Sequence, residues 1–273
     1  MTYCTAIDVG EGLVFCSDSL TNAGVDQVST YSKMHVFETA PDRTFVMLAA
    51  GNLATTQGIC DQIKSDLESG VVPNLNSIPK MNEVADYVGH VSVEQQQKHG
   101  GGGPDYEVSL IIGGQISGEE PRIMLVYSQG NHITTSDDTR FLQIGESKYG
   151  KPILDRIVRG DTSLDTSVMC SLVSMDSTMR SNLTVGPPIE VVVYKRDSFQ
   201  LTARLKLGAD SEYLRTLRQH WDQRLKEAFQ QLPPLAWSAN WDNAGNTVQS
   251  AAQQPQPVQQ QQQGPPGSDT VWR

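Results

Sequence analysis

The chain has 273 residues, enough for one large domain, and a formal net charge of −10 at pH 7. A surface this acidic repels phosphate backbones and anionic lipid headgroups, which argues against nucleic acid and membranes as partners. The N-terminal residues lack the basic and apolar pattern of a targeting signal, and the apolar stretches are too short to span a bilayer. We therefore expect a cytoplasmic protein.

Cysteine and histidine usage bears on metal sites and disulfides. Four cysteines are scattered without CxxC spacing, at Cys4, Cys16, Cys60 and Cys170. This pattern favours buried thiols in a reducing compartment over a disulfide framework. The histidines show no ligand spacing either. We expect no metal ion and no organic cofactor.

The first hundred residues alternate between strand and helix signals. Period-two alternation predicts strands at 2–7, 13–17 and 33–37, and a continuous apolar run predicts a fourth at 44–50. Between them we expect a turn at 8–12, a polar loop at 18–31 and a turn at 41–43. Gly51 and Asn52 then open a helix in which Ile59, Ile63 and Leu67 recur every four residues on one face. A second helix follows Pro79, and the glycine run at 100–103 predicts a flexible loop.

The second half repeats this order. Strands are expected at 106–112, 122–127 and 139–144, with a turn at 113–121, helices at about 147–159 and 164–180, and a final hairpin at 189–195 and 199–205. Pairs of helices separated by antiparallel hairpins suit two sheets packed face to face and covered by helices on the outside. The sequence therefore predicts an α+β fold, a four-layer αββα sandwich.

The C-terminal part differs in composition. Residues 210–229 predict an amphipathic helix with Leu214, Leu217, Trp221 and Leu225 on one stripe. Residues 253–267 are almost entirely Gln, Pro and Gly, which cannot bury enough apolar surface to offset the entropy of ordering. We expect a domain over 1–207, a helical extension over 208–232 and a disordered tail over 233–273.

Four residues carry the chemical argument. Thr2 begins the first strand, Asp18 ends its hairpin partner, Lys33 opens the third strand, and Gly51 lies where an apolar strand turns into a helix. This pattern resembles that of proteasome β-subunits and the HslV peptidase over roughly residues 1–207. Within that superfamily, segment 18–35 is similar to Anbu, the bacterial ancestral β-subunit.

The resemblance implies an N-terminal nucleophile hydrolase in which Thr2, exposed by removal of Met1, attacks a peptide bond. A threonine hydroxyl needs an adjacent base, and a free α-amine with a pKa of about 7.7–8.0 suits that role near neutral pH. Lys33 would lower the pKa of this amine by like-charge repulsion, and Asp18 would hold Lys33 in place. The Gly51 N–H would bind the oxyanion.

Two departures from the family pattern leave alternatives open. Glu146 stands where the family has a supporting serine after Gly145, so Ser147 is the nearest match. For a second supporting motif, the candidate substitutes are Ser181, Asn182 and Thr184. The alternatives are a weakly active or non-catalytic self-assembling structural subunit, and an amidase acting on small amides. The resemblance also implies a peptide or protein substrate and self-association into a ring or an open helical homo-oligomer.

Overall fold

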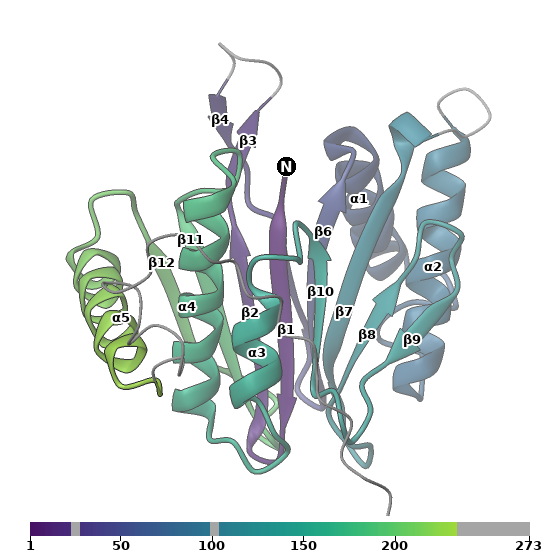
Figure 1. The fold of residues 1–273 in the computed structure, drawn as a ribbon. Coiled ribbons are helices and arrows are strands. Elements are labelled where there is room, and N and C mark those ends of the chain that lie inside the picture. The colour runs from purple at the N-terminus through teal and green to yellow at the C-terminus, as the bar shows by residue number, and fades with distance from the viewer. Residues whose placement is uncertain (23–27, 99–103, 234–273) are drawn as a thin grey trace, which may run out of the picture. The chain divides into compact units, whose positions relative to one another are not determined.

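Two antiparallel sheets form the centre of the molecule (Figure 1). The computed structural model describes residues 1–22, 28–98 and 104–233. The predicted loop at 100–103 and the predicted disorder at 253–267 lie outside these residues. Within the described part, the elements form the expected α+β fold.

The first sheet has five strands within the described residues, in the order β10-β1-β2-β11-β12. Their bounds are β1 Tyr3–Val9, β2 Gly12–Asp18, β10 Phe141–Gly145, β11 Ile189–Lys195 and β12 Leu201–Leu207. All neighbouring strands are antiparallel, and β1 lies between β10 and β2. The strand that follows Thr2 is therefore hydrogen-bonded on both sides.

The second sheet, again counting described residues, has the order β5-β6-β7-β8-β9. Its strands are β5 Met34–Ala40, β6 Arg43–Gly51, β7 Val108–Ile116, β8 Arg122–Val126 and β9 His132–Thr134. A short hairpin of β3 Leu20–Asn22 and β4 Val28–Thr30 connects the two sheets. Since β5 and β6 pair in register up to Met34 and Leu48, Lys33 lies at the same end of this sheet as Gly51.

Helices cover the outer faces of both sheets (Figure 1). Their bounds are α1 Leu53–Ser69, α2 Met81–Gln97, the 3₁₀ turn η1 Pro104–Tyr106, α3 Lys151–Ile157, α4 Leu164–Ser181 and α5 Glu212–Gln230. None of these described helices is long and apolar enough to cross a membrane.

Three apolar layers separate the four layers of backbone. Phe45 of the second sheet packs with Ile59 and Val84 of α1 and α2. Phe15 and Leu48 belong to the layer between the two sheets. On the far side of the first sheet, Ile7, Cys16 and Met175 form a layer that includes α3 and α4. This stacking confirms the αββα sandwich, because each sheet buries one face against the other sheet and one against helices.

Two predicted connections are wrong. The polar loop predicted at 18–31 contains the β3–β4 hairpin, whose strands carry threonine and valine, residues that favour extended backbone. The turn predicted at 113–121 is shorter, because Gly113 and Gly114 lie inside β7. A Cβ on Gly113 would lie 2.7 Å from the side chain of Ile123 and 2.8 Å from that of Phe15, so this glycine permits close packing.

Three further differences concern the ends of two helices and one additional strand. The helix predicted at 147–159 is confined to Lys151–Ile157, with Pro152 in its first turn, where proline costs no hydrogen bond. The short strand β9 was not predicted. At the start of α1 the cap is Asn52, whose side chain accepts a hydrogen bond from the Thr55 N–H at 2.9 Å, so Gly51 is the last residue of β6.

Candidate active site

Thr2 lies at the start of β1, and the N-terminus emerges between the two sheets (Figure 1). Tyr3 pairs with Gly145 at the end of β10, and the Glu146 N–H donates a hydrogen bond of 2.7 Å to the Thr2 carbonyl. Gly145 has φ of 81°, and a Cβ there would lie 2.0 Å from the Thr2 carbonyl oxygen. Glycine is thus required at 145 for this close approach, which fixes the backbone of Thr2.

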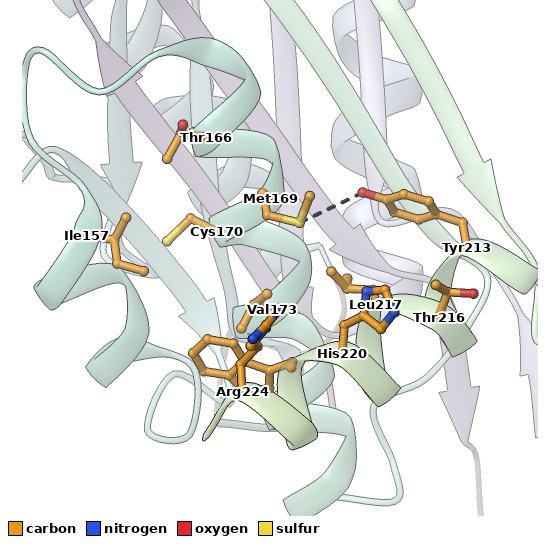
Figure 2. Close-up of a pocket in the computed structure, with 11 residues that line it drawn as sticks. Ile157, Thr166, Met169, Cys170, Val173, Tyr213, Thr216, Leu217, His220 and Arg224 are labelled. Carbon is orange, nitrogen blue, oxygen red and sulfur yellow. Dashed lines mark hydrogen bonds between the residues drawn. The ribbon is translucent and has the colours of Figure 1, made fainter. Parts of the chain in front are cut away.

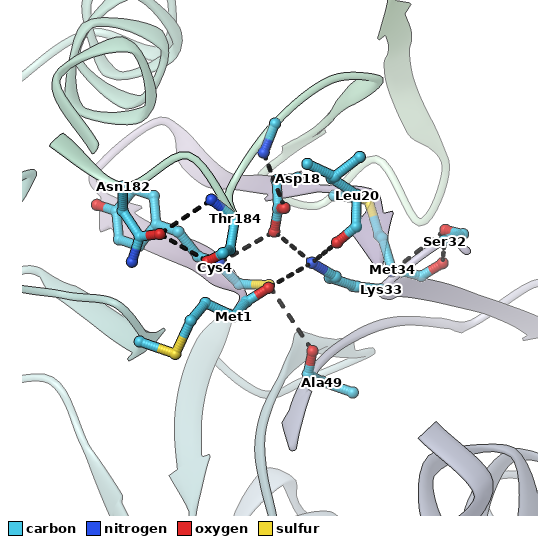
Figure 3. Close-up of polar contacts among 12 residues, drawn as sticks. Met1, Cys4, Asp18, Leu20, Ser32, Lys33, Met34, Ala49, Asn182 and Thr184 are labelled. Carbon is cyan, nitrogen blue, oxygen red and sulfur yellow. Dashed lines mark hydrogen bonds and ion pairs between the residues drawn. The ribbon is translucent and has the colours of Figure 1, made fainter. Parts of the chain in front are cut away.

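A buried ion pair lies beside Thr2. Lys33 Nζ is 2.7 Å from Asp18 Oδ1 and donates to the Leu20 carbonyl at 2.8 Å (Figure 3). The same carboxylate accepts from the N–H groups of Tyr3, at 3.0 Å, and Gly186, at 3.2 Å. Burial raises the pKa of the Asp18 carboxyl, whereas Lys33 and the two backbone donors lower it. Asp18 is completely buried, so this set of donors is its entire compensation for lost hydration.

A pocket of about 260 Å³ brings three of the predicted residues together. Thr2, Lys33 and Gly51 all line it, and Asp18 lies directly behind Lys33. Met1 lines the pocket too, and its carbonyl oxygen is 3.4 Å from Lys33 Nζ (Figure 3). The Thr2 hydroxyl, the Lys33 ammonium and the end of β6 at Gly51 therefore line one cavity. This cavity lies at the end of the sandwich where the N-terminus lies, which we call the open end.

Gly51 closes the opposite wall of this pocket. Its φ is 127°, and a Cβ would lie 2.2 Å from the Glu107 carbonyl oxygen on the neighbouring strand. The first turn of α1 continues the wall with Leu53 and Thr56. The backbone of Gly51 can thus approach a ligand closely, and the amide groups of a helix N-terminus lie next to it.

Two of the candidate supporting residues, Glu146 and Ser147, directly follow β10. Ser147 is half-buried and is held through its backbone. Its N–H donates to the Gly145 carbonyl, and its carbonyl accepts from the Lys151 N–H and from Gln143 Nε2. Glu146 is 9% exposed, and its Oε2 accepts a hydrogen bond of 3.2 Å from Asn182 Nδ2.

Sequence reasoning noted Glu146 and Asn182 separately, as departures from a family pattern, and missed that they contact each other. No sequence spacing signals a pair 36 positions apart on a strand end and a helix end. Gly186, which donates to Asp18, was also missed. In the described part of the chain, no group of three His, Cys, Asp or Glu side chains is placed to hold a metal ion.

A second cavity of about 400 Å³ lies between α4 and α5, on the helix-covered side of the first sheet (Figure 2). Its lining is apolar and includes Met169, Val173, Tyr213 and Leu217. Cys170 also lines it, and burial raises the pKa of this thiol to about 11, which makes it a poor nucleophile at neutral pH. The lining of this cavity is more apolar than that of the pocket beside Thr2.

Known structures resemble the whole sandwich. Anbu (ancestral beta-subunit) from Yersinia bercovieri is 44% identical over 86% of this chain and 99% of its own, with a TM-score of 0.82. Anbu from Hyphomicrobium sp. strain MC1 is 42% identical over 86% and 99%, with a TM-score of 0.79. The helical assembly of the Anbu complex from Pseudomonas aeruginosa gives 40% identity over 88% and 100%, with a TM-score of 0.82. No family model and no curated protein matches the chain.

Replacing Asp18 by asparagine should lower the free energy of unfolding by about 3–5 kcal/mol, because it leaves the Lys33 ammonium buried without a counter-charge. Urea denaturation followed by circular dichroism measures this change. Asp42→Asn is the control, since Asp42 pairs with Arg43 at the surface, where an ion pair contributes little. Equal losses in the two variants would contradict a special role for the buried pair.

Proposed function

We propose that this chain, which belongs to the Anbu family of ancestral β-subunits and has the N-terminal-nucleophile hydrolase fold of that family, is a threonine-type peptidase subunit. The observation that carries this proposal is the arrangement of Thr2, Lys33 and Gly51 around one pocket, with Lys33 bound to buried Asp18. These residue types supply a nucleophile, a tuning charge and an oxyanion donor, the three components of acyl transfer.

In the proposed reaction the Thr2 hydroxyl oxygen attacks the scissile carbonyl, and its proton passes to the free α-amine of the same residue. The Gly51 N–H stabilises the negative charge on the tetrahedral oxygen. The protonated amine then gives the proton to the leaving nitrogen, the C–N bond breaks, and an ester to Thr2 remains. Water attacks this ester with the amine again as base, which releases the acid and restores Thr2.

Met1 has to be removed before this reaction can occur. With Met1 in place the Thr2 nitrogen belongs to a peptide bond and has no basic lone pair. Met1 also lines the pocket, and its carbonyl accepts a hydrogen bond from Lys33. Its removal would open the pocket and place the new amine close to the Lys33 ammonium, which favours the neutral, basic form of that amine.

Incubation of the Met1-free protein with an epoxyketone or β-lactone acylating probe tests the chemistry. Intact mass should increase by one probe per chain, and peptide mapping should place the modification on Thr2. Thr2→Ala should abolish the modification with little change in melting temperature, while Thr202→Ala, an exposed threonine on β12, should react like wild type. Failure of the wild-type protein to react would favour the structural-subunit alternative.

We also infer self-association into a ring or an open helical homo-oligomer. The Pseudomonas aeruginosa relative is a helical assembly. In this chain β12 is largely exposed at the edge of the first sheet, with Leu205 45% exposed, and α5 exposes Tyr213 and Leu225. Exposed apolar side chains on neighbouring elements are typical of surfaces that another subunit covers.

Light scattering should give a homo-oligomer of at least six subunits at micromolar concentration. Leu225→Asp should reduce this size, because a carboxylate on α5 would be buried at the subunit contact. Val72→Asp is the control, since Val72, like Leu225, is an exposed apolar residue but lies in the loop between α1 and α2. A stable wild-type monomer would contradict the assembly, and an unchanged Leu225→Asp oligomer would contradict the role of α5.

A further inference from the structure

Glu146 is a buried acidic residue whose backbone is hydrogen-bonded to the backbone of Thr2, the proposed nucleophile. Its N–H donates to the Thr2 carbonyl at 2.7 Å, and its side chain is 9% exposed. Gly145 brings the two segments so close that a Cβ on residue 145 would be 3.3 Å from the Thr2 Cβ. The carboxylate of Glu146 is therefore within one side-chain length of the main chain of Thr2, where solvent screens charges weakly.

Asn182 fixes the direction of this carboxylate. Asn182 Oδ1 accepts from the Thr184 N–H at 3.0 Å and from the Thr184 hydroxyl at 2.6 Å. Because the backbone N–H can only donate, this end of the amide is the oxygen, and the other end is the NH₂ group. That NH₂ group donates to Glu146 Oε2 at 3.2 Å, so the amide holds one oxygen of the carboxyl group.

The segment after α4 touches two carboxylates that flank Thr2. Asn182 holds Glu146, and four residues later the Gly186 N–H donates to Asp18 Oδ2 at 3.2 Å. Asp18 in turn accepts from the Tyr3 N–H, and Glu146 donates to the Thr2 carbonyl. The start of β1 is therefore held by the Asp18 carboxylate and by the Glu146 backbone, and one loop contacts the side chains of both acidic residues.

The α-ammonium group of the chain belongs to the charges near Thr2, and while Met1 is attached it lies on Met1, one residue before Thr2. Asp18 and Glu146 supply two negative charges, and Lys33 supplies one positive charge. Other ionisable groups nearby are paired elsewhere: Lys151 with Asp155, Arg180 with Asp222, and Glu190 with Lys206. Lys148 is exposed to solvent. The Tyr3 hydroxyl is hydrogen-bonded, and burial raises the pKa of the Cys4 and Cys16 thiols, so these groups are uncharged. Removal of Met1 moves the α-ammonium group onto Thr2, where it and Lys33 together balance the two carboxylates.

We propose that Glu146, oriented by Asn182, is a positioning residue that holds the α-ammonium group of Thr2 at the mouth of the pocket after Met1 is removed. The inference rests on the proposed function only in requiring a free Thr2 amine, and it does not require hydrolysis. Lys33 and Glu146 then act in opposite directions on that amine. Lys33 favours its neutral form and Glu146 favours its protonated form, so the balance between them sets the pH at which the base becomes available.

Glu146→Gln removes the charge and keeps an oxygen that can accept from Asn182. The pKa of the Thr2 amine should fall by about half a pH unit or more, because an opposite charge no longer stabilises the ammonium. Glu146→Asp keeps the charge and should restore most of the wild-type value. Asn182→Ala leaves the carboxylate free to turn away and should lower the pKa of the amine by less than Glu146→Gln does.

Periodate cleavage reads this pKa directly. An N-terminal threonine is a 1,2-amino alcohol, which periodate cleaves between Cα and Cβ when the amine is neutral, releasing acetaldehyde and ammonia and leaving a terminal aldehyde. The rate of the mass change, measured against pH in the full-length Met1-free protein, gives a midpoint for each variant. Since every variant meets the same periodate species at a given pH, the ratio of variant to wild-type rates isolates the amine.

Glu68→Gln, which removes an exposed carboxylate of α1, is the matched control and should keep the wild-type midpoint. Identical midpoints for wild type and Glu146→Gln, or an equal shift in Glu68→Gln, would overturn the inference. A blocked N-terminus that resists periodate would overturn it as well. If the midpoint shifts but acylating probes fail to react, the positioning role stands and the peptidase proposal fails, so the two failures are distinguishable.

Discussion

The buried contact between Asp18 and Lys33 holds the open end of the sandwich together. Asp18 ends β2 in the first sheet, and Lys33 immediately precedes β5 in the second, so their 2.7 Å contact joins the two sheets beside the N-terminus. Because each charge has lost its hydration, neither partner is stable in this position without the other. The carboxylate also binds the N–H groups of Tyr3 and Gly186. One side chain therefore sets the positions of the strand that follows Thr2, the Lys33 ammonium and the loop after α4.

Glycines supply the second constraint, since they let backbone segments approach where a side chain would prevent it. Gly145 allows β10 to reach the Thr2 carbonyl, and Gly51 allows β6 to turn into α1 against Glu107. Eight of the twelve residues that line the pocket between these two glycines are Gly, Ala, Ser or Thr. Preorganised donors in such a site need not move when charge develops on a substrate. Fixed geometry, more than any single strong interaction, is what the fold contributes to the proposed chemistry.

The sequence predicted the layers well, because apolar periodicity reports which face of each element is buried. The strand containing Phe45 and the helix containing Ile59 were placed correctly for this reason. Gly113 was misread as part of a turn, since glycine marks both turns and close packing, and packing depends on partners such as Phe15 that lie far away in sequence. The same limit hid the contact between Glu146 and Asn182, which exists only once α4 and β10 have been brought to one end of the sandwich.

The central claim is that Thr2 provides both nucleophile and base, which requires a free α-amine on Thr2. Intact mass and N-terminal sequencing of the protein purified from its native host test this most directly. The account predicts a chain that begins at Thr2, with a mass lower by one methionine residue than that of the full sequence. A chain that quantitatively retains Met1 would contradict it, because the Thr2 nitrogen would then be an amide and Met1 would still line the pocket.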